Sequence, residues 1–234
     1  GALMVLRTMP DDVEFTAVVK ATGQGLGHGH FDKLGLLFSA GDNEVVQDYG
    51  SARWVNVEQK HGGRYLPENK TWAKQTVAHN ALVVDRTSHF NGNYKTASGE
   101  SPIPLFFDAS NPNFQLCVAK DTSAYPGVSI TRYVILINDS ALSAPLVIDA
   151  VTAQSNTEHT YELPYQFIDG YIDSRPPLRA KNDLEVMGSK AGFEHLFLES
   201  QSAIADSSYS FTWFRNKRFY TITSSATPND TISM

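Results

Sequence analysis

The chain has 234 residues, of which 41% are hydrophobic and 19% charged, and its formal net charge is −6. This length and apolar content are enough to bury a core and exclude a disordered chain. The negative charge argues against non-specific nucleic-acid binding, which needs a basic face, and no apolar run approaches the ~18 residues of a membrane helix. The single cysteine, Cys117, lies in an apolar run, which predicts a buried and inert thiol.

The first predicted strands show an apolar residue at every second position. Residues 13–19 alternate in this way, as expected for a strand with one buried face. Residues 34–38 and 44–47 flank the turn-forming segment 39–43, which predicts a hairpin. A short apolar strand is expected at 81–84.

The second half continues the same pattern. Strands are predicted at 128–137, 146–151, 160–167, 196–198, 211–214 and 219–222, the last two joined as a hairpin by 215–218. No segment of twelve or more residues has an apolar stripe of helical period. These patterns predict an all-β fold, an antiparallel multi-strand sandwich of two sheets, as one domain over residues 1–234.

The segment 23–90 is rich in titratable residues. It holds five of the seven histidines, together with several arginines and lysines. Long loops of this kind on a rigid sheet are where functional residues are usually found. The part of the chain from about residue 110 onward has the composition of a scaffold.

A metal site is one interpretation of these histidines. His28 and His30 are two residues apart, so on an extended segment both side chains face the same side. With Asp48 and His79 they make a plausible zinc site, because two imidazoles and a carboxylate suit that ion. The spacing alone is not specific, however, and ordinary hydrogen-bonding histidines of a loop are equally compatible with it.

Acid–base chemistry is a second interpretation, centred on Tyr65. This residue lies in a glycine-rich loop next to Arg64 and near Glu68. A free tyrosine has a pKa near ~10, so it would need neighbouring cations such as Arg53 to act near neutral pH. The alternative is an aromatic side chain that anchors the loop.

Four ordered blocks carry a resemblance to a known family. They are Gly27-His-Gly-His-Phe-Asp-Lys-Leu34, Asp48-Tyr-Gly-Ser-Ala-Arg53, Gly62-Gly-Arg-Tyr-Leu-Pro-Glu-Asn69 and Lys74-Gln-Thr-Val-Ala-His-Asn80. Together they resemble the C-terminal sheet domain of heparinase II/III-like polysaccharide lyases, and most closely the oligoalginate lyases of polysaccharide lyase family 17. The blocks cover about residues 23–90, and the rest of the chain agrees in strand layout.

The resemblance implies β-elimination next to a uronic acid in oligo-alginate or a related polymer. A base removes the proton at C5, the resulting anion is stabilised, and an acid protonates the departing O4. In such lyases the active site lies between an N-terminal helical toroid and the sheet domain. The toroid is absent here, so we expect a fragment of a larger lyase that is inactive or nearly so alone. The resemblance also implies a bacterial periplasmic or secreted location and allows a homodimer.

The motifs assign individual roles by resemblance. His30, Asp48 and His79 match the metal ligands, with one zinc ion in a mainly structural role and a water completing four positions. His28 and Arg53 match residues that contact the uronate, and Tyr65 matches the catalytic tyrosine that protonates O4.

Two other classes of protein remain alternatives. One is a non-catalytic carbohydrate-binding β-sandwich, in which Trp54, Trp72 and Tyr65 stack on sugar rings. The other is a purely structural sheet domain whose metal only closes loops. A binding module has no need of the His30, Asp48 and His79 set together with Tyr65, whereas a lyase does.

Overall fold

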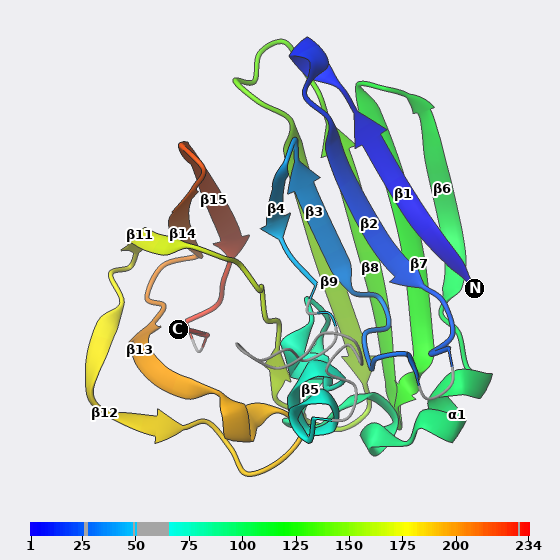
Figure 1. Cartoon of the computed structure of the whole chain (residues 1–234), viewed down its shortest axis with the longest axis vertical. Coiled ribbons are helices and arrows are strands. Elements are labelled where there is room, and N and C mark those ends of the chain that lie inside the picture. Colours follow the sequence, from blue (N-terminus) through cyan, green and yellow to red (C-terminus); the bar gives the residue numbers. More distant parts are fainter. Residues whose placement is uncertain (26–27, 49, 51–65, 229) are drawn as a thin grey trace. The chain divides into compact units, whose positions relative to one another are not determined.

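The computed structural model of the chain describes residues 1–25, 28–48, 50, 66–228 and 230–234. About half of them lie in antiparallel strands (Figure 1). The chain divides into two compact units. Unit 1 comprises Gly1–Gln166 and Lys190–Gly192, and unit 2 comprises Phe167–Ser189 and Phe193–Met234. Each unit is described by itself.

Two four-stranded sheets form most of unit 1. The first sheet consists, in spatial order, of β1 (Ala2–Thr8), β2 (Phe15–Ala21), β3 (Leu36–Ala40) and β4 (Asn43–Val46). The second consists of β6 (Ile103–Asn111), β7 (Phe114–Tyr125), β8 (Val128–Ile137) and β9 (Leu146–Ser155). All neighbouring strands within each sheet are antiparallel, so short hairpins connect most of them.

The two sheets share one hydrophobic core. Strand β8 shows how it is built, because every second residue from Val128 to Leu136 is buried. Val134 lies opposite Cys117 on β7, and both belong to the same buried cluster as Leu6 and Val19 of the first sheet. Figure 1 shows the sheet β1–β4 in front of the sheet β6–β9. The predicted two-sheet, all-β sandwich is therefore confirmed, and so is the buried thiol of Cys117, whose pKa burial raises to about 12.

The remaining elements of unit 1 are short. Strand β5 (Val83–Val84) pairs with β10 (Tyr161–Glu162), and the helix α1 (Tyr94–Gly99) has Asn93 as its N-cap. Single turns of other helix types lie at Pro10–Asp12, Asn69–Ala73, Thr76–Ala78 and His89–Gly92. Within the described chain no helix has the length and apolar character to cross a membrane.

Unit 2 contains two three-stranded sheets. One is β11 (Gly170–Arg175), β14 (Ser208–Arg215) and β15 (Arg218–Ser225), and the other is β12 (Arg179–Val186), β13 (Phe197–Ala203) and β16 (Thr231–Ser233). A single helical turn lies at Phe193–His195. The ring of Trp213 is 1% exposed and packs against Phe167, Phe211 and Tyr220. Aromatic packing is thus the main feature of this unit's interior.

Several strand predictions succeed where one face is buried, although β1 and β7, which also bury residues, were not predicted. The range 128–137 coincides with β8, and the hairpin predicted around 215–218 is found as β14 and β15. The predicted strand 160–167 is wrong in extent, because only Tyr161–Glu162 pairs with another strand. Strands β6 and β12 were not foreseen. Every residue of both is exposed, so neither carries the alternation that marks a half-buried strand.

Candidate metal centre

The loop between β2 and β3 brings His30 and Asp32 to the site. Gly29 is needed there, because a Cβ atom at this position would lie 1.2 Å from the main-chain oxygen of Gln24. The same close approach lets the Gln24 side chain donate a hydrogen bond of 3.1 Å to the carbonyl of Gly29. His28 is exposed, His30 is half-buried and Asp32 is buried.

Lys33 holds this loop against α1. Its side chain is buried, and Nζ donates to the carbonyl oxygens of Ala97 and Glu100 at 3.2 and 2.5 Å. Burial lowers the pKa of Lys33 from its usual value, although Asp121 and Asp32 counteract this effect. The ammonium group therefore satisfies carbonyls beside the end of α1 and ties the loop to a second element.

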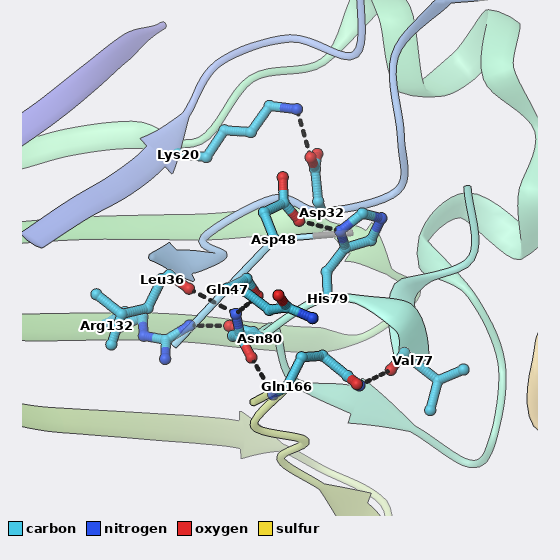
Figure 2. A network of polar contacts seen from close by, with 10 residues as sticks. All are labelled: Lys20, Asp32, Leu36, Gln47, Asp48, Val77, His79, Asn80, Arg132 and Gln166. Carbon is cyan, nitrogen blue, oxygen red and sulfur yellow. Dashed lines mark hydrogen bonds and ion pairs between the residues drawn. The ribbon is translucent and has the colours of Figure 1, made fainter. Parts of the chain in front are cut away.

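His79 approaches from a different part of the chain. It follows the single helical turn at Thr76–Ala78, and its ring is 1% exposed. Nδ1 of His79 contacts Oδ1 of Asp48, a residue just past the end of β4. Figure 2 shows Lys20, Asp32, Asp48 and His79 grouped together, although they come from four separate stretches of unit 1.

The donor atoms of His30, Asp32 and His79 all lie within 4.8 Å of one another. The centres of the two imidazole rings are 5.1 Å apart. Of the three ligands predicted from the sequence, the structure thus brings His30 and His79 together and places Asp48 in contact with His79. Asp32 was missed, although its position two residues after His30 was a usable signal.

The electrostatics of the cluster favour a neutral His30 and an ionised Asp48. Burial and the neighbouring His79 lower the pKa of His30 to about 4. Burial alone would raise the pKa of Asp48, but the contact with His79 outweighs it and lowers the value below the usual range. Near neutral pH both groups therefore carry lone pairs that a metal ion can accept.

Two buried polar atoms of the cluster have no hydrogen-bond partner in the described chain. They are Oδ1 of Asp32 and Nε2 of His79. Leaving such atoms without a partner is costly, and a bound cation is one group that would satisfy them. Two imidazoles with carboxylate oxygens are also a donor set that suits zinc. The residues present therefore fit the ion that the sequence predicts.

A buried polar network supports the segment that carries His79. Arg132 on β8 is 2% exposed, and its Nη1 donates to the carbonyls of Leu34 and Asn80 at 2.7 and 2.5 Å. Its Nε and Nη2 donate to both carboxylate oxygens of Asp149, at 2.8 and 2.6 Å. The buried guanidinium is thereby paired with a carboxylate and donates hydrogen bonds from all three of its nitrogen atoms, which compensates the cost of burying its charge.

The side chain of Asn80 binds the backbone of three neighbouring segments. Its Nδ2 donates to the carbonyls of Leu36 and Gln47, at 2.9 and 2.6 Å, and its Oδ1 accepts from the backbone N–H of Gln166 at 2.6 Å (Figure 2). Because Asn80 directly follows His79 and Gln47 directly precedes Asp48, one amide group fixes the backbone on both sides of the His79–Asp48 contact.

The remaining predicted site residues fall into two groups. Arg53, Trp54 and Tyr65 lie outside the described residues. Trp72 is half-buried within the turn Asn69–Ala73, and His28 is solvent-exposed next to the cluster's loop. Their assigned roles stay predictions.

Comparison with known proteins identifies the class. The heparinase II/III-like C-terminal family matches residues 2–230, and the chain belongs to this family. Two curated relatives were found. An exo-oligoalginate lyase of Saccharophagus degradans is 42% identical over 221 residues, and an alginate lyase of Stenotrophomonas maltophilia is 43% identical over 223. Each alignment covers 94% of this chain and 30% of the relative, so the chain spans about a third of their length.

Solved structures share the fold at much lower identity. A heparinase III superposes with a TM-score of 0.54 at 16% identity, covering 99% of this chain and 33% of that one. The heparan sulfate lyase HepC of Pedobacter heparinus gives a TM-score of 0.54 at 13% identity, covering 99% and 34%. The resemblance read from the four sequence blocks is therefore confirmed at the level of the family and the fold.

Proposed function

We propose that the chain is the sheet domain of a polysaccharide lyase that cleaves oligo-alginate or a related uronate polymer by β-elimination. The observation that carries the proposal is the buried convergence of His30 and His79, with Asp48 against His79, in a chain of the heparinase II/III-like family. The two curated relatives, which are named for action on alginate, support alginate as the substrate class.

The proposed metal ligands are His30, Asp48 and His79, and the proposed ion is zinc. When bound, the ion would hold three loops of unit 1 together and would contribute no redox chemistry. His28 lies on the same loop as His30 but is exposed, so its side chain is available to a sugar acid. Arg53 is proposed to bind the uronate carboxylate through its planar guanidinium group.

Tyr65 is proposed as the residue that protonates the departing O4. Elimination removes the C5 proton, forms the C4–C5 double bond and breaks the bond from C4 to O4. Tyr65 supplies the proton to that oxygen, which leaves an unsaturated uronate on the other product. The base and part of the carboxylate-binding set are proposed to come from a helical domain, so the chain alone should have no meaningful activity. The intact enzyme is proposed to be periplasmic or secreted.

The test compares the chain alone with the chain joined to a helical domain, using oligo-alginate and the ultraviolet absorbance of the unsaturated product. We expect activity in the joined protein, a loss of at least ~100-fold in Tyr65→Phe, since general acid catalysis contributes ~10²–10⁴-fold, and no change in the matched control Tyr94→Phe on the exposed helix α1. Full activity of Tyr65→Phe would remove the catalytic assignment. Binding of oligo-alginate without any product would instead favour the carbohydrate-binding alternative.

A further inference from the structure

The carboxylate of Asp32 is satisfied at only one of its two oxygens. The residue is 4% exposed, and Oδ2 accepts a hydrogen bond of 2.5 Å from Nζ of Lys20. Oδ1 has no hydrogen-bond partner among the residues that the structure describes. A buried carboxylate oxygen without a donor or a cation is strongly unfavourable. The side chain therefore faces a group that the described residues do not supply.

The backbone on both sides of Asp32 is held in place. The N–H of Phe31 donates to the carbonyl of Lys74 at 2.9 Å, and the N–H of Leu34 donates to the carbonyl of Lys20 at 2.8 Å. Lys20 therefore contacts this segment twice, through its carbonyl and through its ammonium group. The position of the carboxylate is set by these contacts and does not depend on a flexible loop.

Asp32 belongs to the histidine cluster. Each of His30, Asp32 and His79 has one donor atom within 4.8 Å of the other two. A structural ion pair with Lys20 accounts for Oδ2 of Asp32 but leaves Oδ1 unexplained. A metal ion between the imidazoles would account for both this oxygen and the short distances in the cluster.

We propose that Asp32 is a further zinc ligand, binding through Oδ1 while Lys20 holds Oδ2. This inference rests on the metal site of the proposed function and extends it. Asp32, His30 and His79 converge within 4.8 Å, and Asp48, a ligand of the proposed function, contacts Nδ1 of His79. Two carboxylates near the imidazoles balance the charge of the ion.

The test measures zinc affinity of the 234-residue chain by competition with a chromophoric chelator. The variants are Asp32→Asn and Asp48→Asn, and the matched control is Asp85→Asn. Asp85 also contacts an imidazole, that of His159 at 2.6 Å, but lies outside the cluster. We expect Asp32→Asn to weaken zinc binding by more than ~100-fold, beyond the ~10–100-fold typical of an outer-shell partner. Asp85→Asn should bind zinc like the wild type.

Lys20→Gln separates a ligand from a structural anchor. If Asp32 binds the ion, Lys20→Gln keeps the ligand and loses less affinity than Asp32→Asn, within the ~10–100-fold range. The visible spectrum of the cobalt-substituted chain should shift in Asp32→Asn, where a ligand is replaced, and stay the same in Lys20→Gln. Equal losses in the two variants, or an unchanged cobalt spectrum in Asp32→Asn, would overturn the assignment.

The variant Asp48→Asn distinguishes a failure of the Asp32 assignment from a failure of the metal site in the proposed function. If Asp48→Asn loses zinc while Asp32→Asn retains it, Asp32 is not a ligand and the metal site of the proposed function stands. If the wild-type chain binds no zinc, both metal assignments fall. Lyase activity is not read in this experiment, so the proposed elimination chemistry is tested separately through Tyr65.

Discussion

The two units of the chain bury different kinds of side chain. Among the described residues, every buried charged or imidazole side chain lies in unit 1: Asp32, Lys33, His79, His89, Asp121 and Arg132. In the described part of unit 2 the buried polar side chains are three serines, Ser174, Ser200 and Ser202, and its interior is otherwise formed by aromatic and aliphatic residues.

This difference indicates which unit contains the functional site. Burying a charged group costs free energy unless hydrogen bonds or counter-charges compensate it, so a plain scaffold avoids such groups. Unit 1 keeps several of them, and two of these, Asp32 and His79, belong to the histidine cluster, whereas the interior of unit 2 is formed mainly by aromatic and aliphatic packing. Perturbed buried groups are typical of functional sites. The comparison predicts that changes in unit 1 affect the metal and changes in unit 2 affect only stability.

The largest expected effect is loss of the metal on removal of a ligand in unit 1. His30→Ala should abolish stoichiometric zinc binding, because it removes one of the two imidazoles of the cluster. His195→Ala, in unit 2, should retain the ion. Metal analysis of the purified chains measures both. One zinc ion per chain in His30→Ala would contradict the predicted ligand set.

The second largest expected effect is a loss of stability when the hydrogen bonds of Arg132 are removed. Arg132→Met removes four hydrogen bonds and leaves the carboxylate of Asp149 without its partner charge. We expect the free energy of unfolding to fall by about 3–5 kcal/mol, as for other broken buried ion pairs. Chemical denaturation measures the change, with the exposed Arg218→Met as the control. A loss below ~1 kcal/mol, the worth of an exposed ion pair, would show that the network is not a major support.

A third effect is acid sensitivity from the buried imidazole of His89. Burial lowers its pKa from 6.5 to about 4, so the unfolded chain binds a proton before the folded chain does. Stability is therefore greatest above pH 6.5 and falls as the pH drops toward 4. His89→Phe should lose less stability than the wild type between pH 7 and 4.5, by on the order of 2 kcal/mol. Parallel pH profiles of the two proteins would contradict this account.

The smallest effect is expected in unit 2. Ile204 is 1% exposed, and Ile204→Val removes one methylene group from the interior. The free energy of unfolding should fall by about 0.5–1.5 kcal/mol, while zinc affinity stays unchanged. Ile172→Val, on the exposed face of β11, serves as the control and should change stability by less than ~0.5 kcal/mol. A loss of zinc in Ile204→Val would contradict the prediction that changes in unit 2 affect only stability.

The success of sequence reasoning depended on local signals. Strand β8 was found because its buried and exposed residues alternate along the chain, and β6 was missed because all its residues are exposed. His30 and His79 were found through short motifs that contain them. Asp32 was missed even though it lies within such a motif, because nothing in the local pattern shows that one of its oxygens lacks a partner.

The order of residues was sufficient to establish the all-β class, the family and the candidate histidines, because alternation and short motifs are written along the chain. Only the folded chain shows that Arg132 holds the backbone at Leu34 and Asn80, and that Lys20 occupies one oxygen of Asp32 and leaves the other without a partner. Such relations join residues up to 98 positions apart. They depend on strand register and on which side chains lose contact with water, and neither property is encoded in a local pattern.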